Sequence, residues 1–316
     1  MHSTDINTLT LQELLDRRRK FLALMNSRFP AWDTALITEN VNKYYFTGTM
    51  QDGIILIKRD GTLVYGVRRS LERALAESPL PEQEFSAITT YRDLARIQGG
   101  NLGETYIEGD TMPVVTRERL EKYFTMSSTG YFDSVTRTVR SVKSPYEIEA
   151  IRQSGIAHQK LMDEMVPALL KEGMTELEFI GELSRAMYSL GYQGLSRFHQ
   201  YQVDISNGQS GFGTNSLAPT WFDGPGGSKG NGPWAPFSGD STKKLTWGEP
   251  VFVDVSFGVQ GYHSDKTQIY FFGDEILREY TEAHRFCIDI QKQIADMLKP
   301  GEIPSKIYET KTVFEV

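Results

Sequence analysis

Residues 251–274, VFVDVSFGVQGYHSDKTQIYFFGD, set two aspartates, Asp254 and Asp265, eleven positions apart among apolar and aromatic residues. Apolar and polar residues alternate on both sides of the glycine-bounded break at 258–261, a pattern that predicts a β-hairpin. With the turn centred between Val259 and Gln260, the two aspartates lie equally far from the turn and therefore face each other directly. We expect two carboxylates side by side on one face of the hairpin.

Such a pair has to be neutralised. Directly opposed residues hold their Cβ atoms roughly 4.5–5.5 Å apart, and like charges there destabilise a sheet. A shared proton, a nearby lysine or arginine, or a bridging cation would remove the repulsion. Lys266 is a poor partner because it follows Asp265 directly and points to the opposite face of the strand. A metal ion that binds both carboxylates is the more specific of these interpretations. The alternative is a solvated hairpin with a shifted register, since Val-Gln is not a favoured turn pair and a bulge would separate the carboxylates.

Composition limits the partners. The chain has 316 residues, 39% of them hydrophobic, and a net charge of -7, so it is long enough for two domains and has no basic footprint for nucleic acid. Cys287 is the single cysteine, which excludes a disulfide framework and a cysteine-rich zinc site. No apolar run has the length of a signal-peptide core or of a membrane span. We expect a cytoplasmic protein with neither nucleic acid nor membrane as partner.

The first 138 residues have the pattern of an α/β domain. A helix is predicted over residues 10–27, and strands are predicted at ALIT, GIILIK and TLVYGV, separated by turn residues. We find no catalytic constellation in this part of the chain. The aromatic residues of YYFTGTM, at 44–50, are expected to serve packing.

Two capping boxes mark helix starts after a domain boundary at 138/139. Ser144 with Glu147 opens one helix, and Thr175 with Glu178 opens the next, which runs to about residue 190. His158 lies on the apolar stripe of the first helix, and we expect it to be a core residue without a catalytic role.

The order helix, Lys-x-Gly, helix recurs at 275–316, after the hairpin. Such an internal duplication predicts two half-units around a shared site. The second half-unit has no strands in this sequence, so we expect a truncated protein or a fragment.

The run VFVDVSFGVQGYHSDKTQ resembles the first metal-ligand hairpin of the pita-bread metallopeptidase family, in its aminopeptidase P, prolidase and creatinase branch. The matching positions are Asp254, Gly261, Tyr262, Ser264, Asp265 and Thr267. Gln268 departs from the pattern, which has arginine there. VRSVKSPYEIEAIRQSG and LKEGMTELEF also resemble family segments. The resemblance implies an α/β creatinase-like N-terminal domain over 1–138. It also implies an α+β pita-bread catalytic domain over 139–316, comprising the first half-unit and the start of the second.

The resemblance further implies a dinuclear metal site with five protein ligands: two aspartates, one histidine and two glutamates. Asp254 and Asp265 would hold two divalent ions, with manganese, cobalt, zinc or iron admitted by such ligands. Thr267 would hydrogen-bond a ligand carboxylate, although a strand-forming threonine without a role explains it equally well. A metal-activated water would cleave a small peptide next to proline. The resemblance also implies a homodimer, because two-domain members of this branch usually pair.

Two departures limit this expectation. The histidine and both glutamates belong to the second half-unit, and His284 is the only histidine after the hairpin. We therefore expect the chain as it stands to bind metal weakly and to be inactive.

The second departure is Thr220, which stands where many family peptidases have a substrate-contacting histidine. The segment that follows, 222–230, is rich in glycine and aspartate. It is either a substrate-facing loop, with Trp221, Phe222 and Trp234 as apolar contacts, or a plain surface loop.

His199, on a predicted strand before this loop, is a candidate to replace the missing imidazole. Three functions remain open at this point. The first is a metal-dependent Xaa-Pro peptidase, the second a metal-free creatinase-like C–N hydrolase, and the third a non-catalytic binding or scaffold protein. The retained aspartates argue against the second, because opposed carboxylates without compensation are costly.

Overall fold

The computed structural model describes residues 8–197, 204–222 and 224–311 and divides the chain into two units. Unit 1 comprises residues 1–154 together with 197–204 and 259–262. Unit 2 comprises residues 155–196, 205–258 and 263–316. The domain boundary at 138/139 stays a prediction.

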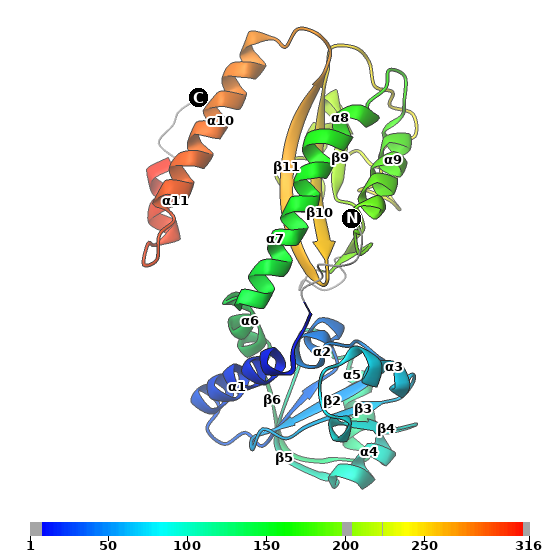
Figure 1. Cartoon of the computed structure of the whole chain (residues 1–316), viewed down its shortest axis with the longest axis vertical. Coiled ribbons are helices and arrows are strands. Elements are labelled where there is room, and N and C mark those ends of the chain that lie inside the picture. The colour runs from blue at the N-terminus through cyan, green and yellow to red at the C-terminus, as the bar shows by residue number, and fades with distance from the viewer. Residues whose placement is uncertain (1–7, 198–203, 223, 312–316) are drawn as a thin grey trace. The chain divides into compact units, whose positions relative to one another are not determined.

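Unit 1 is built on a six-stranded mixed sheet with the order β4-β3-β2-β1-β5-β6 (Figure 1). β1 pairs antiparallel with β2 and parallel with β5. The three strands expected from the sequence are β1, β2 and β3. The strands are β1 Thr34–Ile37, β2 Gly53–Lys58, β3 Leu63–Val67, β4 Phe85–Ala87, β5 Asn101–Ile107 and β6 Thr125–Tyr131.

Both faces of this sheet are buried, because neighbouring strand residues point to opposite sides. On β2, Ile55 and Ile57 belong to one core cluster, and Ile54 and Leu56 belong to another. Helices precede, connect and follow the strands. They are α1 Leu11–Arg28, α2 Asn40–Thr47, α3 Leu71–Glu77, α4 Tyr91–Gln98, α5 Val114–Glu121 and α6 Asp133–Ser141, with a 3₁₀ turn at Glu82–Glu84.

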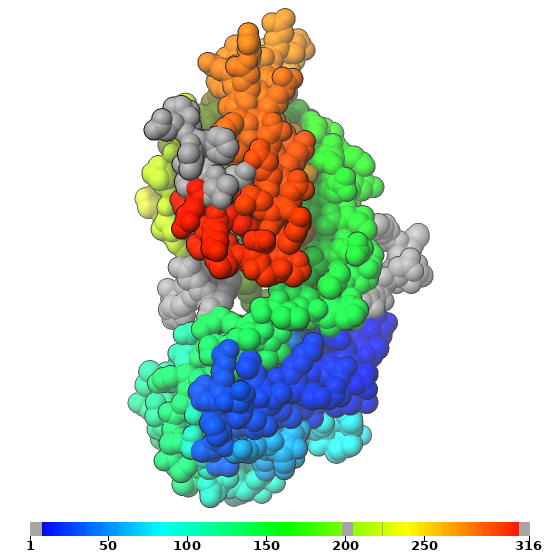
Figure 2. Space-filling model, turned by 90° about the vertical axis from the view of Figure 1, so that its left-hand side faces the viewer, coloured from blue at the N-terminus to red at the C-terminus, as the bar shows by residue number. Residues whose placement is uncertain are grey.

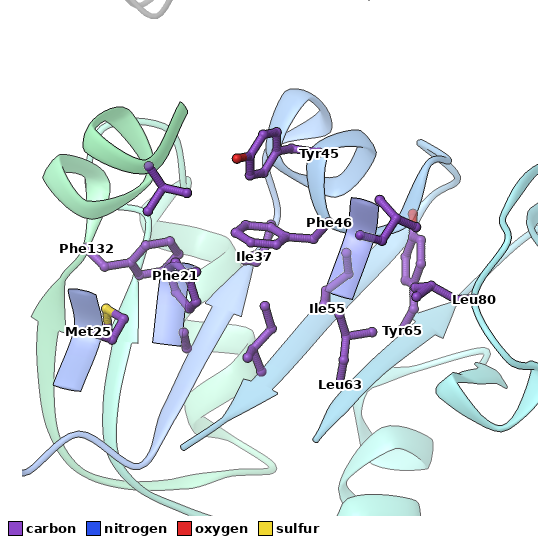
Figure 3. Packing of buried hydrophobic residues seen from close by; sticks show 14 of the residues in the cluster. Phe21, Met25, Ile37, Tyr45, Phe46, Ile55, Leu63, Tyr65, Leu80 and Phe132 are labelled. Atoms are coloured by element: carbon purple, nitrogen blue, oxygen red, sulfur yellow. The ribbon is translucent and has the colours of Figure 1, made fainter. Parts of the chain in front are cut away.

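The larger core cluster is aromatic at its centre. Figure 3 shows Phe21 of α1 between Phe46 and Phe132. The ring centroids of Phe21 and Phe46 lie 5.1 Å apart, and those of Phe21 and Phe132 lie 5.6 Å apart, both edge to face. The aromatic residues Tyr45 and Phe46 are buried in this cluster, so YYFTGTM does supply packing.

A buried arginine organises the polar interior of unit 1. Arg17 is 1% exposed; its Nε donates to Glu13 Oε1 at 2.8 Å and its Nη1 to the Tyr45 carbonyl at 3.0 Å. Its Nη2 donates to the Tyr262 hydroxyl at 2.8 Å, and that hydroxyl donates to Glu147 Oε1 at 3.1 Å. Every branch of the guanidinium is thus satisfied, as a buried charge requires.

The predicted helix starts are confirmed. The Glu147 backbone N–H donates to Ser144 Oγ and the Ser144 backbone N–H donates to Glu147 Oε2, so this capping box opens α7, Pro145–Lys160. The reciprocal bonds of Thr175 and Glu178 open α9, Glu176–Ser189. Between them lie a π-helical turn, Leu161–Met165, and α8, Val166–Leu169.

Unit 2 contains a three-stranded sheet with the order β11-β10-β9. β9, Gln209–Phe212, pairs antiparallel with β10, Glu249–Val259, so that Gln209 faces Asp254. β11, Tyr262–Phe272, completes the long hairpin of Figure 1. The remaining pieces are β7 Ser196–Arg197, β8 Asp204–Ile205 and a 3₁₀ turn at Gly213–Leu217.

Two helices follow the hairpin, as predicted: α10, Arg278–Met297, and α11, Pro304–Lys311. No described residue of α10 is buried, and Figure 2 shows both helices, in orange and red, at the surface. None of the helices in the described ranges combines the length and apolarity needed to cross a bilayer.

Candidate metal site

The hairpin turn lies one residue later than the sequence predicted. β10 ends at Val259 and β11 begins at Tyr262, so Gln260 and Gly261 form the turn, with φ angles of 54° and 84°. Two consecutive left-handed residues are the mark of a type I′ turn, whose twist matches the twist of the flanking strands. The position of Gly261, not the Val-Gln pair, therefore sets the turn.

This shift corrects the expected pairing of the aspartates. Counting outward from Val259 and Tyr262 puts Thr267, not Asp265, opposite Asp254. Thr267 Oγ1 accordingly donates to Asp254 Oδ1 at 2.5 Å. Asp265 lies two residues before Thr267, on the same face, and is the diagonal neighbour of Asp254. Diagonal positions are roughly 7–8 Å apart, within reach of a shared ligand but without direct contact.

The two carboxylates differ in exposure. Asp254 is 8% exposed, and burial raises its pKa, an effect opposed by the Thr267 hydrogen bond and reinforced by the charge of Asp265. Asp265 is exposed as a residue. Partial desolvation of its carboxyl raises its pKa, opposed by the Lys266 backbone N–H and the charge of His263. Both carboxylates would thus gain from a nearby positive charge.

Lysine does not supply that charge among the described residues. Lys266 Nζ lies 3.4 Å from Asp163 Oδ1 instead, as expected from its position on the opposite strand face. Two carboxylate oxygens on one face are suitable hard ligands for Mn²⁺ or a similar divalent cation. The donor set is partial: the described ranges hold no group of three or more His, Cys, Asp or Glu side chains that fits a metal ion.

Thr220 lies beside this face. The Gln209 Nε2 group donates to Thr220 Oγ1 at 3.3 Å, and Gln209 is the register partner of Asp254. Thr220 is therefore linked to Asp254 through Gln209, and its correspondence to the family histidine stays a prediction.

The residues after Thr220 form an aromatic group. The ring of Phe237 lies 5.4 Å from Trp221 and 5.9 Å from Phe222, centroid to centroid. Trp221 is 58% exposed, and Trp234 is 81% exposed. A substrate-facing role for these rings stays a prediction, and His199 lies outside the described residues.

His158 is buried, as predicted, at 2% exposure. Its ring stacks on Phe257 with centroids 5.8 Å apart, and its Nδ1 lies 3.0 Å from Ser264 Oγ. Its Nε2 has no hydrogen-bond partner in the described parts of the chain. Burial, helped by the charge of Lys266, lowers the pKa of His158 to about 4.

Sequence reasoning missed Gln209. β9 is only four residues long and contains serine and glycine, which strand propensity disfavours. Its pairing with β10 brings Gln209 beside Asp254, and no local pattern in the sequence predicts that pairing.

A creatinase-type α/β unit with a strand hairpin carrying two aspartates defines a class: the pita-bread metallopeptidases. The profile of metallopeptidase family M24 matches residues 149–311, and that of the creatinase/prolidase N-terminal domain matches residues 17–142. The chain belongs to metallopeptidase family M24.

Solved structures share the fold. A prolidase from Pyrococcus horikoshii OT3 has a TM-score of 0.74 and 21% identity, covering 92% of this chain and 75% of its own. An X-Pro aminopeptidase from Thermotoga maritima MSB8 has a TM-score of 0.66 and 19% identity, with coverage of 88% and 70%. These likenesses confirm the predicted creatinase-like and pita-bread architecture.

Among curated relatives, an uncharacterized peptidase of Staphylococcus aureus (strain USA300) is 25% identical over 279 residues, which are 87% of this chain and 71% of the relative. A second, from strain bovine RF122 / ET3-1, is 26% identical over 283 residues, with the same coverage.

Proposed function

We propose that this protein is a metal-dependent hydrolase of the Xaa-Pro peptidase type, cleaving a peptide bond next to proline. The observation that carries the proposal is the pair of carboxylates, Asp254 and Asp265, on one face of the β10–β11 hairpin. Family membership supports peptide hydrolysis, and the prolidase and X-Pro aminopeptidase folds support the substrate class.

Each residue of the site has a proposed role in binding or orienting the metal. Asp254 and Asp265 would hold divalent cations, for which manganese is our first candidate. Thr267 fixes the rotamer of the Asp254 carboxylate through its hydrogen bond and so keeps one carboxylate oxygen directed toward the ligand. When bound, the metal pair supplies Lewis-acid activation of a water molecule near neutral pH.

Metal binding is the direct test. Free Mn²⁺ is counted by electron paramagnetic resonance while the purified protein is titrated, because protein-bound Mn²⁺ gives a broadened signal. We expect binding that is lost in Asp254→Asn and in Asp265→Asn. Asp163→Asn is the matched control, since Asp163 pairs with Lys266 on the opposite strand face. Equal Mn²⁺ binding by all four proteins would refute the carboxylate site.

Activity tests the substrate class. Hydrolysis of Xaa-Pro dipeptides is measured with and without Mn²⁺, and we expect every turnover that is detected to require the metal and both aspartates. Turnover without metal that survives Asp254→Asn would indicate the creatinase-like C–N hydrolase instead.

Thr220 favours a second candidate, a non-catalytic binding protein. A threonine hydroxyl cannot donate as an imidazolium does, so the charge developing on the substrate would lack that stabilisation. The expected sign of this function is Mn²⁺ binding without turnover of any Xaa-Pro dipeptide. Restoration of turnover in Thr220→His would then identify the missing group.

A further inference from the structure

Gln209 is buried beside Asp254. The residue is 1% exposed and faces Asp254 across the β9–β10 pair. Directly opposed residues of an antiparallel pair share one face of the sheet, with Cβ atoms roughly 4.5–5.5 Å apart. The Gln209 carboxamide therefore lies on the face that also carries Asp265 and Thr267.

The Oε1 atom of Gln209 has no hydrogen-bond partner in the described parts of the chain. A buried acceptor without a partner costs about 1–3 kcal/mol. Native proteins keep few such groups, and each one calls for an explanation such as a bound ion.

Thr220 determines which way the carboxamide points. Thr220 Oγ1 donates its hydrogen to the Phe222 carbonyl at 3.4 Å and accepts from the Phe222 backbone N–H at 3.2 Å. With its hydrogen used, the hydroxyl accepts from Gln209, so the Nε2 group of Gln209 faces Thr220 at 3.3 Å. Oε1 is consequently directed away from Thr220.

Oε1 is buried and borders Gly224, which carries no side chain. A Cβ atom added at Gly224 would lie 3.6 Å from Oε1 and 3.2 Å from the Phe222 ring. An unpartnered acceptor on the face that carries the Asp254 carboxylate repels anions and attracts a cation or a strong donor.

We propose that Gln209 Oε1 is a third oxygen donor toward the cation held by Asp254 and Asp265. This inference rests on the proposed function. Amide carbonyl oxygens are ordinary ligands of hard divalent cations. A neutral donor also adds a contact without adding a third negative charge to a buried site. Thr220 then has a role of its own, because it orients the ligand amide.

The test uses Mn²⁺ affinity, measured by paramagnetic resonance on the whole protein. Gln209→Met keeps the length of the side chain and removes the oxygen, and we expect affinity to fall about tenfold, as for other supporting groups at metal sites. Gln209→Glu supplies a charged oxygen at the same place, and we expect tighter binding than in the wild type.

Ser210→Ala is the matched control. Ser210 is also 1% exposed with an unpartnered Oγ in the described ranges, but it faces Val253, on the other side of the sheet. We expect its Mn²⁺ affinity to equal that of the wild type.

Two outcomes overturn the inference while leaving the proposed function intact. One is Mn²⁺ binding that requires Asp254 and is unchanged in Gln209→Met. The other is loss of peptide affinity in Gln209→Met at unchanged Mn²⁺ affinity, which would assign Oε1 to a donor group of the substrate. Absence of Mn²⁺ binding by the wild type would overturn both proposals. If Gln209→Met fails to fold, as judged by circular dichroism, Gln209→Glu decides: affinity no higher than in the wild type contradicts the inference.

Discussion

The buried carboxylates of Glu108 and Asp254 differ in how many hydrogen bonds they accept. Glu108 of unit 1 is 1% exposed and accepts hydrogen bonds from the backbone N–H groups of Thr38 and Glu39, the Thr38 hydroxyl and the Asn42 amide, at 2.6–2.9 Å. Asp254 accepts one, from Thr267, among the described residues. Burial of an anion needs several such donors or a cation, so this contrast supports the proposed cation at Asp254.

His158 makes the stability of the protein depend on pH. Its pKa is about 4 in the folded state and about 6.5 in an unfolded chain. Below pH 6.5 the unfolded chain therefore binds the proton first, and the free energy of unfolding falls as pH decreases from 6.5 to 4. The loss from this one group is on the order of 3 kcal/mol.

We expect His158→Phe to remove this contribution. Phenylalanine keeps the stack on Phe257, so the variant should lose less stability than the wild type between pH 7 and pH 4.5. Urea unfolding at both pH values measures the difference. His284→Gln, at an exposed position of α10, is the control and should behave as the wild type. A wild-type pH dependence in His158→Phe would contradict the assignment.

At the residue scale, sequence reasoning placed Asp254, Asp265 and Thr267 on one strand face, because an alternating strand pattern fixes which residues share a face, and Thr267 does contact Asp254. It did not locate Gln209, and it did not predict that the buried Nε2 of His158 lacks a hydrogen-bond partner among the described residues. Both depend on which strands and helices lie together, and such long-range contacts leave no periodic signal in the sequence.

The hairpin turn offers a test at the scale of the element. Gln260 adopts φ 54°, a left-handed conformation that costs most residues roughly 1 kcal/mol and costs asparagine less. We expect Gln260→Asn to raise the free energy of unfolding by about 0.5–1 kcal/mol.

Gly261→Ala should act in the opposite direction. Its φ is 84°, and an added Cβ would lie 3.0 Å from the Tyr44 ring, so we expect a loss of roughly 1–2 kcal/mol. Urea unfolding of both variants gives the comparison. Gly301→Ala is the control: it also has positive φ, at 96°, but no neighbouring atom within 4 Å, so the excess loss at Gly261 reports the contact. Stabilisation by Gly261→Ala would contradict the turn type.

The elements themselves were largely predictable. α1 and α9 begin and end within a few residues of the predicted positions, and α7 begins where its capping box predicts, because capping residues act locally. The register of β10 on β11 was not, since a one-residue change in the turn alters every opposed pair.

At the scale of the whole molecule, Mn²⁺ should stabilise unit 2 selectively. Binding to the folded state alone at a hundredfold excess over Kd contributes about 2.7 kcal/mol, which is a rise in melting temperature of about 5–10 °C for a unit of this size.

Tryptophan fluorescence can follow the unfolding of each unit separately. Trp32 is buried in unit 1, and Trp221, Trp234 and Trp247 belong to unit 2. A protein that keeps only Trp32, with phenylalanine at the other three positions, should melt at the same temperature with and without Mn²⁺, whereas Trp32→Phe should report the rise. Fluorescence melts measure both. Equal shifts would show that the units unfold together.

The two-domain plan followed from the resemblance of the N-terminal and hairpin motifs, and the family profiles confirm it. The sequence did not reveal that residues 259–262 belong to unit 1, because a turn carries no sign of the distant side chains it meets.

That arrangement has a consequence for synthesis on the ribosome. Arg17 is made early, but the hydroxyl that its Nη2 contacts belongs to Tyr262, 245 residues later. At 5–20 residues per second, roughly 12 to 50 s of translation separate the two. During that interval the Nη2 group of Arg17 lacks the Tyr262 hydroxyl that it contacts in the folded chain. The unit therefore completes its interior only when the hairpin tip has left the exit tunnel.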